Sequence, residues 1–163
     1  MKKGYTLIEL IIVLSIITIL ASISIINVGR FREKFENIEL NNLATEVKSL
    51  LSFGKSYCRK NKVPGKIIVG ADRKTITFEV TNNSYETSKS IKLKDSMDIG
   101  SNFNSSGNIK TNENNINDEG FIKSAGTITI TNGYNKRIEI TVSVGNDIIR
   151  SYPNDSEEGD IIQ

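Results

Sequence analysis

Residues 5–26 read YTLIELIIVLSIITILASISII, a run of 22 residues that contains a single charged side chain, Glu9. As an α-helix rising about 1.5 Å per residue, this run is roughly 33 Å long, close to the hydrocarbon thickness of a bilayer. Lys2 and Lys3 precede it, so the positive-inside rule leaves the N-terminus in the cytoplasm and places the rest of the chain across the membrane. The stretch therefore predicts one membrane-spanning helix.

A secretory signal peptide, cut near Ala21 to Ser24, is the alternative interpretation of the same run. Two features argue against it, because the run is longer than a usual signal core and Glu9 lies in its first turns. A carboxylate costs about 2.5–3.5 kcal/mol at the centre of a bilayer and less near the interface. Glu9 therefore needs a partner, unless it is simply a tolerated interfacial residue. A cut after Gly4 would supply one as a free α-ammonium on Tyr5, in the same chain or in a staggered neighbouring helix.

Residues 3–10 (KGYTLIEL), followed by the apolar run, closely resemble the class III signal of type IV prepilins and type II secretion pseudopilins. The resemblance implies that a membrane aspartic peptidase, the prepilin peptidase, cuts between Gly4 and Tyr5 and methylates the new amine of Tyr5. It also implies that Glu9 supports subunit assembly. Tyr5 departs from the family pattern, which usually has Phe there. The implied location is the inner membrane, single-pass, and afterwards an extracytoplasmic pilus or pseudopilus.

Beyond Ile26 the pattern predicts that the helix continues as an amphipathic helix to about Asn61, where Pro64-Gly65 stops it. The apolar residues recur every three to five positions: Val28, Phe31, Phe35, Ile38, Leu43, Val47, Leu50, Leu51 and Tyr57. Alternating segments separated by turns then predict strands over residues 66–69, 74–80, 90–94, 126–131, 137–144 and 148–152. Residues 97–119 are rich in Asn, Ser and Gly and predict a long surface loop, partly strand near Ile109.

The predicted fold class is α+β and resembles a pilin: a long N-terminal helix, half transmembrane and half amphipathic, packed on an antiparallel β-sheet head. We expect a prepilin leader at 1–4, a transmembrane and assembly helix at 5–28, and an amphipathic half at 29–61. A β-rich head at 62–153 and a polar tail at 154–163 follow. One core is expected to join the helix to the sheet through Leu43, Val47, Leu50, Ile128, Ile130, Ile138, Ile140 and Val142.

Composition removes most enzyme chemistry. The chain has no His and a single Cys, Cys58, so Ser/His, Cys/His and His-metal sites cannot be built, and no internal disulfide can form. Cys58 is expected to be a small buried hydrophobe. Asp95 and Asp98 are carboxylates that no motif organises, so the sequence does not support a membrane-tethered enzyme. We expect neither a catalytic residue nor a metal or cofactor.

The second half resembles the C-terminal part of the GspH/FimT type of minor pseudopilin. Residues 121–130 read FIKSAGTITI, and a hairpin follows that ends with VSVG at 142–145. The resemblance implies a minor, tip-associated subunit that enters a type IV pilus or a type II secretion-like pseudopilus by helix packing. Its implied partners are other pilin subunits and an inner-membrane assembly platform.

A DNA-binding competence subunit is the alternative function. Some members of the GspH/FimT family bind DNA through a final turn that carries Gly-Arg-x-Arg. Here residues 145–150 read GNDIIR, so the first Arg is missing and an Asp intervenes. The net charge of +2 also argues against binding by bulk charge. The remaining candidates for contact with DNA are Lys123, Lys136, Arg137 and Arg150.

Overall fold

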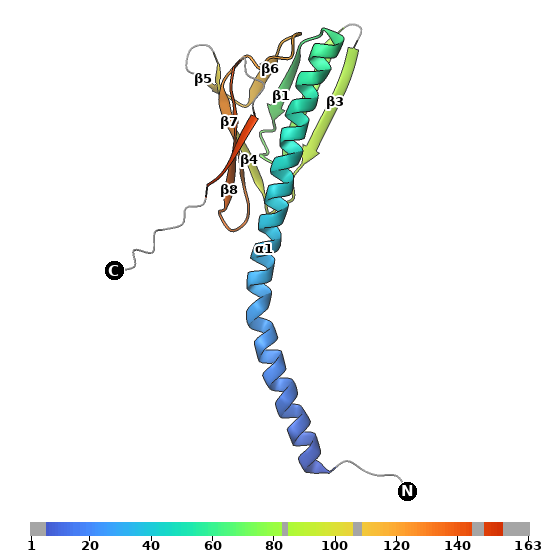
Figure 1. Cartoon of the computed structure of the whole chain (residues 1–163), viewed down its shortest axis with the longest axis vertical. Helices are drawn as coiled ribbons and strands as arrows, with labels where there is room; N and C mark the ends of the chain where they lie inside the picture. The colour runs from blue at the N-terminus through green and yellow to red at the C-terminus, as the bar shows by residue number, and fades with distance from the viewer. Residues whose placement is uncertain (1–5, 83–84, 106–108, 145–148, 155–163) are drawn as a thin grey trace, which may run out of the picture. The chain divides into compact units, whose positions relative to one another are not determined.

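The computed structural model describes residues 6–82, 85–105, 109–144 and 149–154. They form one helix, α1 (Leu7–Asn61), and nine strands, β1 to β9 (Figure 1). The chain divides into two compact units, Met1–Glu36 and Asn37–Gln163. We call the first the N-terminal unit and the second the head. The head contains the C-terminal half of α1 and all nine strands.

Helix α1 ends close to the position that the sequence predicted. The backbone N–H of Val63 donates to the carbonyl of Cys58 at 3.2 Å, and Lys62 has a φ of 55°. This is the backbone pattern of a Schellman cap, in which a residue in the left-handed region closes the last turn. Pro64 follows and cannot return the chain to a helix, so the chain turns into the first strand.

The head contains two antiparallel sheets, where the sequence had suggested one. The first sheet has the order β3-β2-β1-β6 and the second the order β5-β4-β7-β8-β9. The bounds in the first sheet are β1 (Gly65–Val69), β2 (Thr75–Asn82), β3 (Tyr85–Lys92) and β6 (Glu113–Ile116). Those in the second are β4 (Asp98–Ser105), β5 (Ile109–Thr111), β7 (Gly126–Thr131), β8 (Arg137–Val142) and β9 (Ile149–Asn154).

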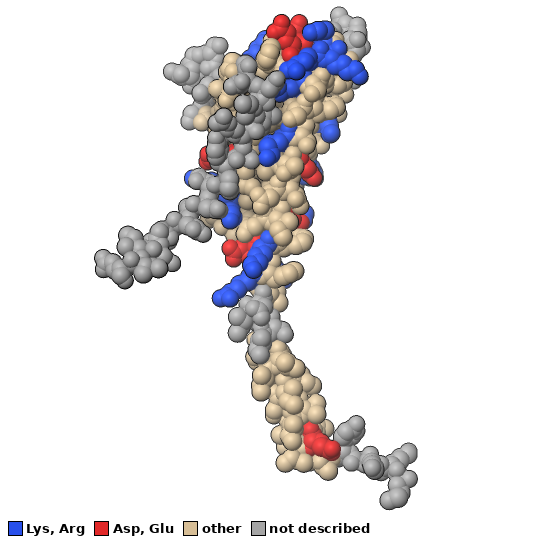
Figure 2. Space-filling model, in the orientation of Figure 1, with Lys and Arg blue, Asp and Glu red and all other residues tan. Residues whose placement is uncertain are grey.

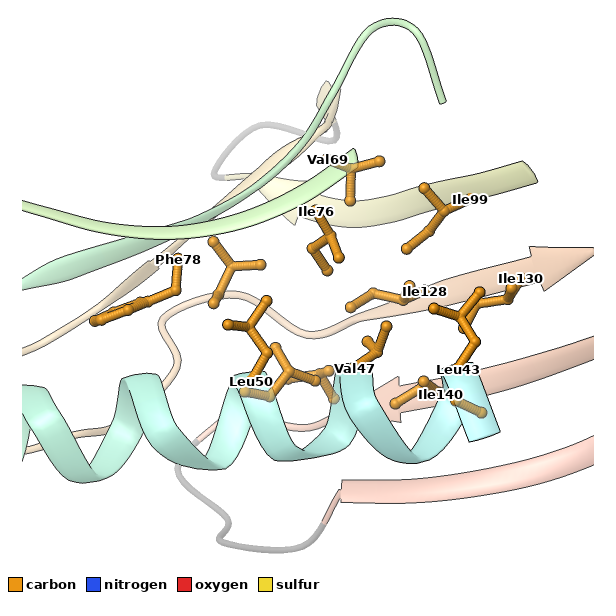
Figure 3. Close-up of a cluster of buried hydrophobic side chains, with 14 of the residues drawn as sticks. Leu43, Val47, Leu50, Val69, Ile76, Phe78, Ile99, Ile128, Ile130 and Ile140 are labelled. Atoms are coloured by element: carbon orange, nitrogen blue, oxygen red, sulfur yellow. The ribbon is translucent and has the colours of Figure 1, made fainter. Parts of the chain in front are cut away.

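One hydrophobic core joins both sheets to the C-terminal half of α1. Figure 3 shows Leu43, Val47 and Leu50 directed from the helix toward side chains of the two sheets. The predicted core is confirmed in full, since each of its members is buried: Leu43, Val47, Leu50, Ile128, Ile130, Ile138, Ile140 and Val142. Residues from the first sheet, Ile67, Val69, Ile76, Phe78 and Val80, complete it. Cys58 is fully buried there, as the sequence predicted.

The expected strand near Ile109 is confirmed by β5, but the prediction of a surface loop over the rest of residues 97–119 is wrong, because β4 and β6 also lie there. Met97, Ile99 and Phe103 are buried, and small or polar residues separate them, which hides the period of two. Asn114 is buried in β6, where its amide donates to the Ser124 carbonyl at 2.7 Å and its side-chain oxygen accepts from the Ser124 N–H at 3.2 Å. Asparagine here replaces missing backbone partners instead of marking a loop.

The remaining strands lie where the sequence predicted strands, but their ends are shifted. Strand β3 begins before the predicted segment 90–94, and β9 continues through Pro153 to Asn154, into the expected tail. The proposed turns at 82–84 and 145–147 lie largely outside the described residues. The hairpin of β7 and β8 is confirmed, and its loop runs on to Lys136 because Asn132 organises it. The Asn132 side-chain oxygen accepts from the N–H groups of Tyr134 and Lys136 at 3.0 and 2.9 Å.

In the N-terminal unit residues 7–36 are helical, and the large apolar side chains described there are exposed. Leu7 is 78% exposed and Ile12 is 54% exposed. Searched over the residues that the structure describes, no helix is long and apolar enough to cross a membrane.

Candidate functional site

The first turn of α1 holds Glu9, the predicted assembly residue. Thr6 precedes the helix, and its backbone N–H donates to Glu9 Oε2 at 2.9 Å. The Thr6 hydroxyl lies 3.0 Å from the same oxygen and 3.4 Å from the Glu9 N–H, to which it is an acceptor. Thr6 and Glu9 therefore form a capping box, in which residues three apart satisfy each other's backbone donors at the start of a helix. The processing residues Gly4 and Tyr5 lie outside the described residues.

The capping box is a feature that the sequence reasoning missed. Its signal is present, since Thr6-Leu7-Ile8-Glu9 has the Thr-x-x-Glu spacing directly before an apolar run. A glutamate near the positive end of the helix dipole is also favourable by itself. The contact gives Glu9 a partner within its own chain, in addition to the amine that the sequence proposed.

Four apolar residues of α1 that the sequence assigned to the amphipathic stripe do not contribute to the core. Val28, Phe31, Phe35 and Ile38 are 50%, 71%, 52% and 58% exposed. The buried face of the helix begins only at Leu40, which is 1% exposed. The spacing of three and four residues places the four side chains on one face of the helix. We call them the exposed stripe.

The structure does not bring the candidate DNA contacts together. The Lys123 N–H donates to the Asn115 carbonyl beside β6, at the end of the head where α1 ends (Figure 1). Lys136 lies in the β7–β8 loop, where Asn132 donates to the Asn37 side chain at 3.0 Å. Asn37 precedes the last turn of α1 by more than twenty residues, or roughly 30 Å of helix.

Arg137 begins β8 at the same end as Lys136, and its Nε lies 3.9 Å from Glu139 Oε1. Arg150 lies in β9 opposite Thr141, and its side chain is outside the described ones. The described cations among the candidates therefore occupy two separate ends of the head.

Of the two carboxylates considered for an enzyme, Asp98 makes an ion pair, and Asp95 contributes its backbone carbonyl to the same lysine. Lys74 Nζ lies 3.0 Å from Asp98 Oδ1 and donates to the carbonyls of Asp95 and Met97 at 2.9 and 2.7 Å. The hydrogen bond from Lys74 lowers the pKa of Asp98 below its usual value. Burial raises the pKa of Cys58 to about 11, which is opposite to the shift that a reactive thiol needs. Among the described residues, no group of three or more His, Cys, Asp or Glu could hold a metal ion.

Comparisons with known proteins concern the N-terminal segment and the fold. Residues 1–25 match the model of the prokaryotic N-terminal methylation motif. The minor pseudopilin EpsH from the type 2 secretion system of Vibrio cholerae has a similar structure, with a TM-score of 0.55 and 13% identity over 71% of this chain and 97% of that one. The fold is that of a pilin. No curated protein matches the chain.

A second solved structure has the same pilin fold. It is the type IV minor pilin FimU of Pseudomonas aeruginosa, with a TM-score of 0.54 and 14% identity over 72% of this chain and 91% of that one. The predicted resemblance to type IV pilins and pseudopilins is confirmed by the motif and the fold, and the GspH/FimT type is consistent with them. The predicted fold class, a long helix packed on an antiparallel β head, is confirmed as well.

Proposed function

We propose that this chain is a minor pilin or pseudopilin subunit, a non-enzymatic protein that enters a type IV pilus or a type II secretion-like pseudopilus by helix packing. The observation that carries the proposal is Glu9 in the first turn of an outward-facing apolar helix, within the methylation motif of a pilin-like chain. A row of exposed apolar side chains is unfavourable in water, and a lone acid is unfavourable in hydrocarbon. A bundle of like helices would cover the apolar side chains and supply the acid with a partner.

Processing precedes assembly in this proposal. The prepilin peptidase cuts between Gly4 and Tyr5 and methylates the Tyr5 amine. Residues 5–26 hold the subunit in the inner membrane, with the leader in the cytoplasm and the head outside. An inner-membrane assembly platform then transfers the helix sideways from the bilayer into the bundle. This chain itself holds no cofactor in the proposal, since the peptidase supplies the methyl group from a methyl donor of its own.

Glu9 has a different partner before and after assembly. In the single chain its carboxylate accepts two hydrogen bonds from Thr6, which reduces the cost of placing a carboxylate near hydrocarbon. In the bundle the Tyr5 ammonium of a neighbouring subunit approaches the same carboxylate. Both contacts involve the charged carboxylate, but the ammonium adds a full opposite charge, whose attraction grows where water is excluded. The exchange of partners favours the assembled state.

The exposed stripe is a further apolar surface for such packing. Phe31 and Phe35 are large and more than half exposed, and apolar faces of this kind mark contacts between proteins. We assign them to contacts with helices of neighbouring subunits. The competence alternative, direct DNA capture through Lys123, Lys136, Arg137 and Arg150, receives no support from the placement of the described side chains.

Co-expression with a prepilin peptidase tests the proposal. The expected product is a chain shorter by the four residues of the leader, with a methyl group on the Tyr5 amine, as measured by intact-protein mass spectrometry. An inactive peptidase is the control and should leave Met1 in place. Cleavage near Ala21, or an intact leader with the active enzyme, would refute the assignment. A salt-dependent DNA shift that needs Arg137 would instead favour the competence alternative.

A further inference from the structure

We propose that the C-terminal half of α1 carries a phosphate-binding site, formed by Ser52, Lys55, Ser56 and Arg59. The proposal goes beyond filament assembly, because it concerns the binding of a ligand by the part of α1 that belongs to the head. It rests on the local charge, on a small surface cavity and on the way in which Arg59 is fixed.

The segment around the end of α1 is strongly basic. From Val47 to Ala71 the chain has six Lys and Arg residues and no Asp or Glu; they are Lys48, Lys55, Arg59, Lys60, Lys62 and Lys66. Figure 2 shows Lys and Arg side chains gathered over the end of the head where α1 ends, beside a smaller number of acidic ones. A local positive potential of this kind attracts anions, although the chain as a whole is nearly neutral.

Helical periodicity places part of this charge on one face. Lys48, Ser52, Lys55, Ser56 and Arg59 follow one another at positions i, i+4, i+7, i+8 and i+11, so they share a side of α1. This face adjoins the buried one, which includes Val47, Leu50 and Cys58. Lys55 is nearest to the core and is only 5% exposed.

A surface cavity of about 230 Å³ opens on that face, and its lining residues are Ser52, Lys55, Ser56 and Arg59. Each of the four side chains is a hydrogen-bond donor, two of them carry positive charge, and none is acidic. Such a lining fits an anion with several oxygen acceptors. A tetrahedral phosphate can accept from two hydroxyls, an ammonium and a guanidinium at once, whereas a carboxylate has only two oxygens. We therefore assign the cavity to a phosphate group.

Arg59 is held in place before any ligand arrives. Its Nε donates to the Glu119 carbonyl at 3.1 Å, and its guanidinium carbon lies 5.9 Å from the centre of the Phe121 ring. Gly120 permits this approach: its φ is 81°, and a Cβ there would lie 2.5 Å from the Lys55 carbonyl. A fixed guanidinium loses little conformational entropy when it binds an oxyanion.

The test uses the full chain in a non-ionic detergent and inorganic phosphate as the probe, followed by ³¹P NMR line broadening at fixed ionic strength. Lys55→Met removes a charge while it keeps a long side chain in the buried position, and Arg59→Gln removes the guanidinium. Each is expected to weaken phosphate binding about tenfold or more, because a hydrogen bond to a charged group contributes about 1.5–3 kcal/mol. Ser56→Ala, at an exposed position, should weaken phosphate binding several-fold. This variant keeps the site testable if the other two fail to fold.

Lys60→Gln is the matched control, because it removes a cation from the same turn that does not line the cavity. It should change binding less than twofold. An equal loss in Lys60→Gln and Arg59→Gln, or no saturable binding by the unmodified chain, would overturn the site, as would stronger competition by an acidic peptide than by phosphate. A twelve-residue oligothymidylate distinguishes two sources of the same chemistry. Tighter, Arg59-dependent binding of the oligonucleotide assigns the site to a phosphodiester polymer, and binding of phosphate alone assigns it to the free ion.

Discussion

Glu9 and Thr6 are joined by two hydrogen bonds to one carboxylate oxygen, at 2.9 Å from the Thr6 backbone N–H and 3.0 Å from its hydroxyl. Thr6 adds a third contact by accepting from the Glu9 N–H at 3.4 Å. The glutamate that the prepilin-like signal assigns to assembly is therefore also a helix cap. The two roles need different properties, because a cap needs an acceptor oxygen whereas pairing with an amine needs a negative charge.

Glu9→Gln separates these roles. Glutamine can still accept from the Thr6 N–H, so the cap remains, but the charge that attracts the neighbouring amine is lost. We expect the variant to insert, to be cleaved and to be nearly absent from filaments, as Glu9→Ala should be. The measurement is an immunoblot of membrane and sheared-filament fractions. Incorporation of Glu9→Gln at the unmodified level would show that the cap alone matters.

Thr6→Ala is the complementary variant. It removes the hydroxyl and weakens the cap by about 1 kcal/mol, but it keeps the Glu9 charge. We expect incorporation close to that of the unmodified chain, measured in the same fractions. If this variant were excluded from filaments as completely as Glu9→Ala, the pairing role of Glu9 would have no support.

Phe31→Ser tests the exposed stripe. Phe31 is 71% exposed and lies outside the core, so its loss should leave the thermal midpoint of the head unchanged while it lowers incorporation into filaments. Leu50→Ala is the contrasting variant, since Leu50 is 1% exposed. It should lower the free energy of unfolding by about 2–5 kcal/mol. A lower midpoint for Phe31→Ser would place this side chain in the core of the subunit and contradict its assignment to a contact between subunits.

The sequence predicted the elements whose periodicity is simple. The helix has a long apolar run and then a stripe that ends at Pro64, and β7 and β8 alternate strictly because Ile128, Ile130, Ile138 and Ile140 all face one core. Strand β4 was not predicted because it alternates around Gly100 and Ser101, which give no hydrophobic signal. Buried Asn114 and Asn132 act through side-chain hydrogen bonds that depend on partners distant in the sequence, Ser124 and Asn37.

For the candidate site too, some features can be predicted from the sequence and others need the structure. The roles of Glu9 and of the cleavage position stay predictions, and they rest on a contiguous motif, which sequence alone can reveal. The exposure of Phe31 and Phe35 could not be predicted, because the same spacing of three to five residues continues from them into the buried face at Leu43 and Val47. Only the position of the sheets decides where burial begins. The separation of Lys123 from Lys136 likewise depends on topology and not on composition.

Gly54→Ala should destabilise the head, although alanine is the better helix former. A Cβ at Gly54 would lie 2.7 Å from Cδ2 of Phe78, whose ring is fully buried. The expected steric cost of overpacking is about 1–3 kcal/mol and exceeds the gain of roughly 1 kcal/mol in helix propensity. Gly29→Ala is the control, since nothing lies within 4 Å of that position. The thermal midpoint should fall for Gly54→Ala and not for Gly29→Ala. Equal midpoints would mean that Phe78 yields without cost.

Asp98 should make a small contribution to acid sensitivity. The hydrogen bond from Lys74 lowers its pKa in the folded chain, so its stabilising effect is present above the unfolded value of about 4 and is lost as the pH falls through the folded value. Asp98→Asn removes this dependence. The difference in thermal midpoint between the two chains should therefore shrink between pH 6 and pH 3. A constant difference over that range would show that the contact with Lys74 does not depend on charge.

Cys58 should be inert to thiol reagents until the head unfolds. Burial raises its pKa from 9.0 to about 11, so at pH 8 the thiolate fraction is about 100-fold lower than in the unfolded chain. Between pH 9 and pH 11 the Cys58 thiol therefore stays protonated in the folded chain, whereas the unfolded chain releases this proton. The stabilisation is therefore complete below about pH 9 and is lost as the pH rises toward 11. Rapid labelling by a thiol reagent at pH 8 without denaturant would contradict this burial.

Cys58→Ala supplies the reference for that pH dependence. It removes the titrating group and leaves a smaller apolar side chain in the core, where a Cβ built on Gly65 would lie 2.9 Å from the sulfur of Cys58. The free energy of unfolding of the variant, measured by denaturant titration, should be lower at pH 8 because a cavity forms. It should then fall less steeply than that of the unmodified chain between pH 9 and pH 11, since only the latter loses the protonated thiol. Parallel pH profiles would show that Cys58 contributes by packing alone.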